Sequence, residues 1–357
     1  MTTYWTMFLV MAVLALAEPV LPRGAKGVRN AAWAVLWLAL VVLIGLRDHV
    51  GPDWEAYERI FFDVRRMSLP ETLAYQDPAY SLLNWLCARV GLDLYAVNTV
   101  SAAIFVSGLI RLCRRQHRPL LSLALATPMI VIVLGMSITR QTAALGVILF
   151  AIPYLEEKRL TWFMALILLA SLFHRSALLL MPMAALVSNT RMSVKAIAVV
   201  AVFLLIYFAG AKARFDIYFE RYILTEQRDP AGVVARLMMN AAPATLFLLR
   251  NKIYDLPPAP RTLWLWLSIF ALCMFPMLIF LPSPIIVDRF SIYFTPIQMV
   301  AYSGYVEAAA RRRFPFRAFH VPALLVLYGV AFWVWLNLGV RSDDWLPYRN
   351  VAIGFLG

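Results

Sequence analysis

Residues 119–138, PLLSLALATPMIVIVLGMSI, decide the class of this protein. The stretch carries no charge, and its 20 residues equal the length that an α-helix needs to cross the roughly 30 Å hydrocarbon core of a bilayer. The basic cluster Arg111–Arg118 stands directly before it and contains four arginines but no acid. An apolar run with bare cations on one flank is typical of a membrane span whose basic flank faces the cytoplasm.

Runs of this kind recur along the whole chain of 357 residues. Hydrophobic residues make up 62% and charged residues 15%, and the mean hydropathy is +0.73, which excludes an ordinary soluble globular protein. The period-two alternation of a membrane β-barrel is not evident. We therefore predict an all-α, polytopic integral membrane helical bundle that forms a single transmembrane domain over residues 1–357.

About twelve transmembrane helices fit the apolar runs. They are expected at 4–22, 30–46, 90–112, 119–139, 142–155, 160–174, 176–190, 194–211, 232–249, 262–281, 290–309 and 320–340, with an additional short or re-entrant piece at 78–89. Two further segments are long enough to fold over the membrane surface, an outer loop at 47–77 and an outer interfacial segment at 212–231. The apolar side of the interfacial segment would consist of Phe215, Tyr218, Phe219 and Tyr222.

The charges between the runs orient the chain. Met1–Pro22 contains no Lys or Arg, so it lacks the basic region of a signal peptide and is expected to be a retained span with its N-terminus outside. The six loops that then face inward hold 18 Lys and Arg against four acids, whereas the outer segments hold 15 against 15. A cytoplasmic N-terminus follows instead if one span is miscounted. Chemistry is expected on the outer side, where the charges are mixed.

Several other classes of site have little support in the sequence. No soluble segment of domain size exists to bind nucleic acid, despite the net charge of +13. Cys87, Cys113 and Cys273 form neither a C-x-x-C motif nor a disulfide framework, and no cluster of His and carboxylates has metal-ligand spacing. We expect no cofactor, no required metal and no nucleic-acid partner.

Ionisable residues in three different spans reach a similar depth below the outer surface. At a rise of ~1.5 Å per residue, Arg140, His174 and Arg236 each lie roughly 21–24 Å from the inner end of their span. Charges at this depth are costly unless they face a polar cavity or a partner. A single arginine would reach the interface by snorkelling. The whole set, with Gln141 and Arg175, favours a polar cavity that opens outward.

Two more polar groups lie at the outer boundary. The stretch RDHVGPDWEAY, residues 47–57, contains a Gly-Pro pair that favours a tight turn, so Asp48 and Asp53 would fold back toward the membrane. A solvated, charge-balanced loop is the alternative. Asp288 and Arg289 follow a proline-broken stretch near the outer interface, where a local ion pair is the alternative interpretation.

Five short motifs contain all of these residues except Arg236 and follow one another along the chain. They are Gly45-Leu46-Arg47-Asp48-x-Val50-Gly51-x-Asp53-x-x-x-Tyr57, Ile138-Thr139-Arg140-Gln141-x-x-Ala144, Leu172-Phe173-His174-Arg175-Ser176-Ala177, Asp288-Arg289-Phe290-Ser291-x-Tyr293-Phe294 and Trp345-Leu346-Pro347-Tyr348. In this order they resemble the signature of the EpsG family of Wzy-like exopolysaccharide polymerases, from about residue 45 to the end. Pro52, where a small polar residue is expected, and Arg175 depart from the pattern.

The resemblance implies polymerisation of lipid-linked oligosaccharide repeats at the periplasmic, outer face of a bacterial inner (cytoplasmic) membrane. The growing glycan would pass from undecaprenyl diphosphate, a polyprenyl diphosphate carrier, onto a single lipid-linked repeat. Besides these substrates and the membrane lipids, a polysaccharide chain-length regulator is an implied partner.

The residue types suit this reaction, because Arg stays charged and binds a diphosphate with bidentate geometry. We expect Arg140 and Arg175 to hold the donor diphosphate, assisted by Arg236 or Arg289. Aromatic rings near the interface suit sugars, although interfacial aromatic belts also account for them. The full set of expected substrate-binding residues is Arg47, Tyr57, Arg140, Gln141, Arg175, Arg236, Asp288, Arg289, Tyr293 and Tyr348.

The acceptor hydroxyl needs a general base. His174 is the expected base, because the ordinary pKa of histidine is roughly 6.5, and Asp48 or Asp53 would orient it or the acceptor sugar. In the competing assignment one of these two aspartates is itself the base.

Other functions need a polar cavity as well. A flippase or transporter of lipid-linked sugar usually carries symmetric repeats, and none is detected. A membrane acyltransferase would draw on a cytoplasmic thioester, so its polar residues should open inward. A ligase that attaches glycan chains to another acceptor stays open, and a purely structural subunit is disfavoured by the cost of several charges in the membrane.

Overall fold

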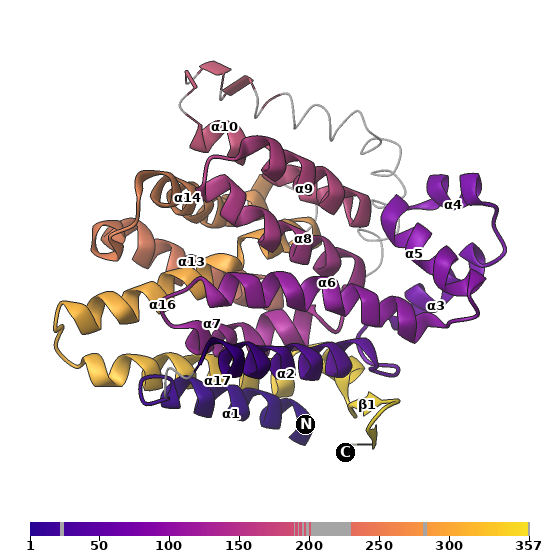
Figure 1. The fold of residues 1–357 in the computed structure, drawn as a ribbon, viewed down its shortest axis with the longest axis horizontal. Helices are drawn as coiled ribbons and strands as arrows, with labels where there is room; N and C mark the ends of the chain where they lie inside the picture. Colours follow the sequence, from indigo (N-terminus) through magenta and orange to yellow (C-terminus); the bar gives the residue numbers. More distant parts are fainter. Residues whose placement is uncertain are drawn as a thin grey trace. The chain divides into compact units, whose positions relative to one another are not determined.

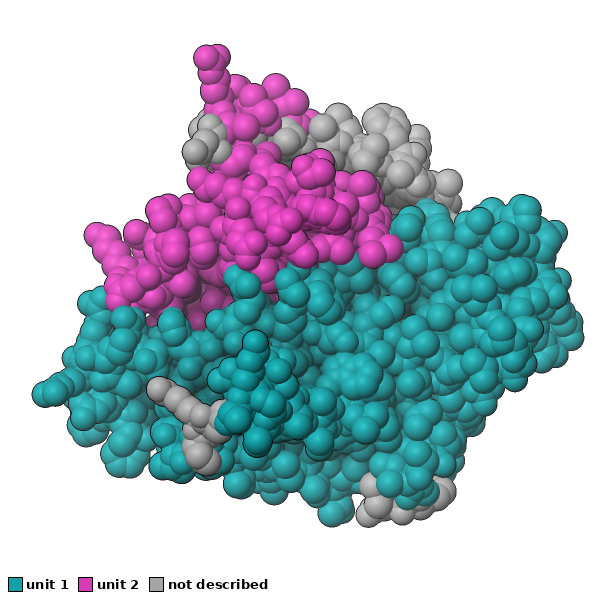
Figure 2. Space-filling model, in the orientation of Figure 1, with its two compact units in different colours: residues 1–150, 172–175, 302–357 teal, residues 151–171, 176–301 magenta. Residues whose placement is uncertain are grey.

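The computed structural model describes residues 1–21, 25–188, 230–280 and 284–355, together with residues 190, 191, 193, 194, 196, 197 and 200. Helices dominate this part of the chain (Figure 1). Contacts divide the chain into two compact units, unit 1 with residues 1–150, 172–175 and 302–357, and unit 2 with residues 151–171 and 176–301 (Figure 2). The expected span at 194–211 and the interfacial segment at 212–231 fall almost entirely outside the described residues.

Most of the secondary structure belongs to one unit or the other. Unit 1 holds α1 (Thr2–Ala17), α2 (Lys26–Gly45), α3 (Trp54–Val64), α4 (Leu69–Tyr75), α5 (Pro78–Arg89), α6 (Leu94–Arg114), α7 (Pro119–Ala126), α17 (His320–Leu338) and the antiparallel strands β1 (Arg349–Asn350) and β2 (Gly354–Phe355). Unit 2 holds α10 (Met183–Val187), α13 (Pro230–Arg250), α14 (Pro258–Phe280) and α15 (Pro284–Ser291). Residues of both units occur in α8 (Thr139–Glu156), α9 (Leu160–Phe173) and α16 (Pro296–Arg311).

The helices confirm an α-helical membrane protein. Within the described residues, five helical stretches are long and apolar enough to cross a bilayer: Lys26–Gly45, Leu94–Arg114, Gly232–Tyr254, Pro258–Ile279 and Arg317–Leu338. Shorter apolar helical stretches are Thr2–Ala17, Pro119–Leu134, Leu160–Phe173 and Arg175–Val187. The additional short piece expected at 78–89 forms α5. The count of about twelve spans stays a prediction.

Two expected spans are wrong in detail, and proline accounts for both. The run 176–190 is not one helix but a 3-10 helix, Arg175–Leu180, followed after Pro182 by α10. The run 290–309 begins in the last turn of α15, passes through a 3-10 helix, Ile292–Phe294, and becomes α16 only at Pro296. Proline lacks an N–H and disfavours helical geometry in the residue before it, so a new helix starts readily at or just after it, as at Pro182 and Pro296.

The uncharged run 119–138 forms the interior of unit 1. Its helix continues from α7 into a π-helix, Thr127–Leu134, that contains Pro128. The wider turn ends where the Gly135 N–H donates to the Ile130 carbonyl, five residues back, at 3.0 Å. All residues from 121 to 137 are buried, so this run faces protein rather than lipid.

Other helices of unit 1 present apolar side chains to their surroundings. Large exposed apolar residues occur on α2 at Val28, Val35 and Leu38, and on α17 at Val326, Val330 and Trp333. Such a surface would be a liability in water but suits contact with lipid chains.

Contacts at the helix ends show how α2 and α6 run relative to each other. Arg114, at the end of α6, donates to the side chain of Asn30 near the start of α2, at 2.7 Å. At the opposite ends, the Tyr95 hydroxyl donates to the Asp48 carboxylate, also at 2.7 Å. The two helices are therefore antiparallel. The basic segment 111–118 and the mixed-charge loop around Asp48 lie at opposite ends of the pair, and the side of the membrane that each faces stays a prediction.

Two glycines let α6 and α8 approach closely. A Cβ atom on Gly146 would lie 2.5 Å from the Phe105 Cα, and one on Gly108 would lie 2.1 Å from the Gly146 carbonyl oxygen. We expect Gly146→Ala to lower the free energy of unfolding by about 1–3 kcal/mol, because the backbones must move apart. The measurement is the melting midpoint in detergent, with Gly27→Ala as the control, since nothing lies within 4 Å of a Cβ at that helical position. Equal midpoints for the two variants would contradict the close packing.

Candidate functional site

The outer loop after α2 is held in place by the segment 344–351. The Asp48 N–H donates to the Arg349 carbonyl at 3.0 Å, and the Gly51 N–H donates to the Asp344 carbonyl at 2.8 Å. Gly51 has a φ of +95°, and a Cβ on it would lie 2.3 Å from the Met136 carbonyl oxygen. Glycine is thus required at this turn for both its conformation and its size.

Arg47 lies beneath this loop and is only 1% exposed. Its guanidinium donates to the Ile44 carbonyl at 2.7 Å, to the Val50 carbonyl at 3.3 Å and to the Thr139 hydroxyl at 2.8 Å. A buried cation needs such acceptors. The contacts tie the loop to the start of α8, and a direct contact of Arg47 with substrate stays a prediction.

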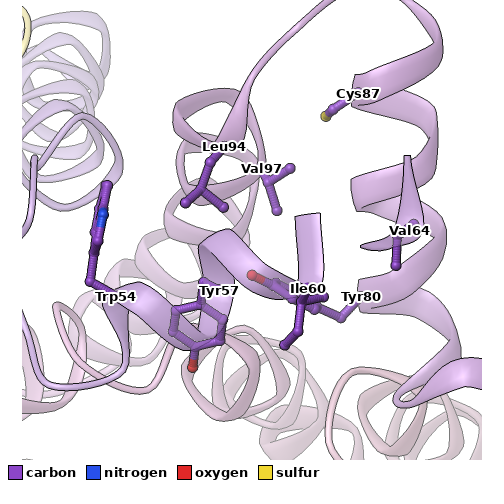
Figure 3. Close-up of a cluster of buried hydrophobic side chains, with 8 residues drawn as sticks. All are labelled: Trp54, Tyr57, Ile60, Val64, Tyr80, Cys87, Leu94 and Val97. Carbon is purple, nitrogen blue, oxygen red and sulfur yellow. The ribbon is translucent and has the colours of Figure 1, made fainter. Parts of the chain in front are cut away.

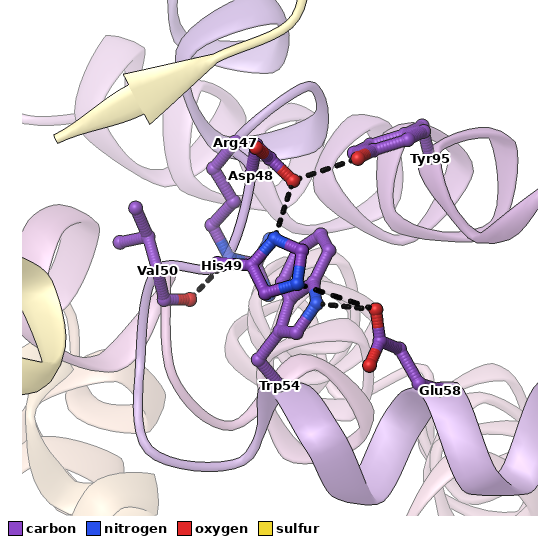
Figure 4. Close-up of polar contacts among 7 residues, drawn as sticks. All are labelled: Arg47, Asp48, His49, Val50, Trp54, Glu58 and Tyr95. Atoms are coloured by element: carbon purple, nitrogen blue, oxygen red, sulfur yellow. Dashed lines mark hydrogen bonds and ion pairs between the residues drawn. The ribbon is translucent and has the colours of Figure 1, made fainter.

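A polar network joins the loop to α3 and α6 (Figure 4). The Asp48 carboxylate accepts from the Tyr95 hydroxyl at 2.7 Å and lies 2.7 Å from His49 Nδ1. The other ring nitrogen of His49 lies 3.7 Å from Glu58, which accepts from the Trp54 indole N–H at 2.8 Å. Burial acts to raise the pKa of Asp48, but the hydrogen bonds from Tyr95 and His49 outweigh it and hold the pKa below its usual range.

An apolar cluster follows the loop and packs α3 against α5 and α6 (Figure 3). Its side chains come from α3, α5 and α6: Trp54, Tyr57, Ile60, Val64, Tyr80, Cys87, Leu94 and Val97. The rings of Tyr57 and Tyr80 lie 5.7 Å apart, and Phe173, at the end of α9, packs against the cluster. The cluster therefore brings the chain before His174 to the outer loop of unit 1.

The central polar contact of unit 1 joins Arg140 to Asp77. One guanidinium nitrogen of Arg140, Nη1, donates to Asp77 Oδ2 at 2.9 Å and to Gln76 Oε1 at 2.8 Å. The guanidinium carbon also lies 6.0 Å from the centre of the Tyr57 ring. Arg140 stands in the first turn of α8, and Asp77 directly precedes α5, which begins at Pro78. Two helix starts thus meet through one ion pair.

The same carboxylate fixes the segment that contains His174 and Arg175. Asp77 accepts a hydrogen bond from the Arg175 backbone N–H, and Asp77 as a whole residue is 7% exposed. Burial raises the pKa of Asp77, although Arg140 and Arg175 act in the opposite direction. His174 is half-buried and adjoins this contact. Arg140 and Arg175 therefore meet at one carboxylate, and His174 precedes Arg175 directly in the chain.

Other expected residues lie around this contact. Gln141 follows Arg140 in α8 and is 2% exposed. Asp53 is half-buried, and its charge acts on the Tyr57 hydroxyl, as does that of Arg140. Desolvation is the main cause that raises the pKa of Tyr57, to about 12. Asp53, Tyr57 and Arg140 thus share one electrostatic environment.

Unit 2 holds a second polar group. Arg236 binds Asp288 in a bidentate ion pair, with Nε–Oδ1 and Nη2–Oδ2 distances of 2.7 and 3.1 Å. One turn further along α13, Asn240 donates to the Ser291 carbonyl at 3.0 Å and accepts from Gln298 at 2.7 Å. Arg289 is half-buried beside Asp288. Arg236 and Asp288, two expected site residues that the sequence did not pair, therefore meet across 52 residues of sequence.

Tyrosines proposed for sugar binding are buried in both units. Tyr57 is 2%, Tyr293 1% and Tyr348 0% exposed. The Tyr293 hydroxyl lies 2.7 Å from that of Ser176, and the Tyr348 hydroxyl donates to the Leu43 carbonyl at 2.8 Å. These rings are packed inside the protein, and their contact with sugar stays a prediction.

Sequence reasoning did not select Asp77, Gln76 or His49. Asp77-Pro78 is a typical helix start, with an acid before a proline in the first turn, but that signal says nothing about Arg140. His49 has a φ of +51°, a strained conformation for a residue with a side chain. That conformation is visible only in the structure.

The two aspartates of this region should respond to pH with opposite signs. The raised pKa of Asp77 means that the folded state binds its proton more tightly than the unfolded chain does. Its contribution to stability therefore rises as the pH falls from the raised pKa to the ordinary 3.8. The lowered pKa of Asp48 gives a contribution that is lost only below 3.8. The measurement is the melting midpoint across pH 3–7. The midpoint of wild type minus that of Asp77→Asn should increase as the pH falls, whereas the midpoint of wild type minus that of Asp48→Asn should decrease only below pH 3.8. The same pH dependence for both differences would contradict the assignment.

Within the described residues, no group of three or more His, Cys, Asp or Glu side chains is arranged to hold a metal ion. A family model described as the EpsG family matches residues 30–350 of the chain. All five sequence motifs lie within the matched range, so the resemblance seen in the sequence is confirmed. No curated protein and no solved structure matches the chain.

Proposed function

The chain belongs to the EpsG family, and from this premise we propose that it is an exopolysaccharide polymerase of the Wzy type. It transfers a growing glycan from a polyprenyl diphosphate onto a lipid-linked repeat at the outer face of the bacterial cytoplasmic membrane. The observation that carries the proposal is the meeting of Arg140, Asp77 and the His174-Arg175 segment beside the outer loop.

The proposed reaction breaks the bond between the sugar C1 and the donor phosphate oxygen, and forms a bond from C1 to an acceptor hydroxyl oxygen. The leaving diphosphate gains negative charge. Arg140 and Arg175 are cations that do not deprotonate, so they can stabilise that charge throughout the reaction. The hydroxyl proton passes to His174, with Asp53 or Asp48 as the competing base.

The ion pair between Arg140 and Asp77 supports this assignment. A guanidinium held by a buried carboxylate is fixed in place before the substrate arrives, and preorganised charges of this kind stabilise transition states most effectively. Arg236, fixed by Asp288, and the adjacent Arg289 offer the same chemistry in unit 2.

The test uses purified protein in proteoliposomes with the polyprenyl-diphosphate-linked repeat that accumulates in source cells lacking the protein. No nucleotide sugar is added, and products are separated as a glycan ladder. A ladder of two and more repeats is expected. Absence of longer products would refute the polymerase, and passage of the lipid-linked repeat across the vesicle membrane without elongation would identify a flippase.

A further inference from the structure

A groove on the outer part of unit 1 has no role in the chemistry described above. It has a cavity volume of about 530 Å³ and lies between α3 and the start of α6. That size falls within the roughly 300–1,000 Å³ of typical small-molecule sites. Its lining residues are Trp54, Glu58, Arg59, Phe61, Phe62, Asp63, Arg65, Asp93, Leu94 and Tyr95.

The groove adjoins the loop that carries Asp48 and His49. Tyr95 lines the groove and donates its hydroxyl to Asp48. Trp54 and Glu58 also line it, and the His49 ring lies 5.3 Å from the Trp54 ring, tilted by 33° (Figure 4). A molecule in the groove would therefore reach the outer loop at one end.

The charges of the groove select against a diphosphate. Three carboxylates line it, those of Glu58, Asp63 and Asp93, against the two guanidinium groups of Arg59 and Arg65. A polyanion would meet a net negative lining, whereas sugar hydroxyls donate hydrogen bonds to carboxylates and accept them from guanidinium groups.

The rings of the groove suit the apolar faces of sugars. Phe62 is 45% exposed, and the guanidinium carbons of Arg65 and Arg66 lie 4.6 and 4.0 Å from the centre of its ring, so a sugar would share the ring with these side chains. Phe61 and Tyr95 are half-buried in the same lining. The groove thus combines aromatic surface, which suits the apolar face of a sugar, with charged groups that can bind its hydroxyls.

We propose that this groove binds the saccharide of a lipid-linked repeat and so orients the acceptor toward the outer loop. The inference rests on the proposed function and deepens it by separating a saccharide site from the diphosphate site around Arg140. Glu58 and the ring of Phe62 contact the sugar. Asp48 and His49 lie at one end of the groove, in contact with Tyr95 and Trp54 of its lining.

Two variants test the groove, each with a matched control. Glu58→Gln removes a charge but keeps an oxygen for the Trp54 indole, and Glu55→Gln makes the same change at an exposed position of α3 outside the lining. Phe62→Ala removes the exposed ring, and Phe316→Ala removes a ring that is 78% exposed at the opposite end of unit 1.

The first measurement is polymerisation rate against acceptor concentration. We expect each groove variant to raise the acceptor KM about tenfold with kcat changed less than twofold, and the controls to match wild type. The second measurement applies detergent-purified protein to an array of bacterial surface saccharides and needs no catalysis. Wild type and Arg140→Ala should bind the same saccharides, and Glu58→Gln and Phe62→Ala should lose that binding.

The two measurements separate the two proposals. No saccharide binding on the array, or binding that both groove variants retain, would overturn the groove assignment even if wild type makes a ladder. Saccharide binding that depends on Glu58 and Phe62 in a protein that makes no ladder would uphold the groove and refute the polymerase.

Discussion

Arg140→Ala is expected to lower the rate of polymerisation by about 100- to 1,000-fold, the usual effect of removing one preorganised donor to a developing negative charge. Asp77 and Gln76 hold the guanidinium in place before the reaction. Water that fills the space left by the substitution must reorient as the charge develops, so it stabilises that charge less. Arg140→Lys keeps the charge but not the fork geometry, so it should recover only part of the rate. The measurement is the rate at which the two-repeat product forms under single-turnover conditions.

The substitution also leaves the Asp77 carboxylate, buried to 10% side-chain exposure, without the cation that faces it. A loss of folding must therefore be separated from a loss of chemistry. Melting midpoint and gel filtration in detergent serve this purpose, and Arg114→Ala, an exposed arginine at the inner end of α6, is the matched control. A folded Arg140→Ala protein with normal turnover would remove Arg140 from the mechanism.

His174→Ala is expected to lower kcat by about 100- to 10,000-fold, the range that a general base contributes. The half-buried ring adjoins the Arg175 N–H that binds Asp77, so it lies beside the proposed diphosphate site. His117→Ala, at an exposed position in the inner basic cluster, is the control and should keep full activity.

Asp53→Asn decides between the two assignments of the base. If His174→Ala retains near-normal turnover while Asp53→Asn loses it, the aspartate is the base and the histidine assignment is wrong. Asp343→Asn changes an exposed carboxylate of the outer segment and controls for charge alone. A bell-shaped pH profile that loses its acidic limb only in His174→Ala would support the histidine.

The apolar runs of the sequence predicted the membrane class and most helices, because hydrocarbon thickness fixes how long such a run must be. They did not predict the helix breaks near Pro182 and Pro296, since both sides of each break are equally apolar. The π-helix at Thr127–Leu134 was likewise invisible, because hydropathy does not report hydrogen-bond register.

The candidate site likewise contains residues that the sequence predicted and one, Asp77, that it did not. Counting residues along a helix placed Arg140 and His174 at one depth. In unit 1 Arg140 binds Asp77, and so does the backbone of Arg175, the residue after His174. Asp77 itself is 63 residues from Arg140 and belongs to a loop full of acids. Only tertiary packing distinguishes it from its neighbours, because a carboxylate's partner depends on contacts that no local pattern records.

The hydrogen bonds between segment 344–351 and the loop around Asp48 bear on how the protein is made in the cell. A ribosome adds about 5–20 residues per second, so the roughly 300 residues between the two segments take about 15–60 seconds to translate. During that time the loop lacks the segment whose backbone carbonyl groups bind it. We therefore expect a nascent chain to remain inert among its lipid-linked substrates until segment 344–351 has been made and has bound the loop.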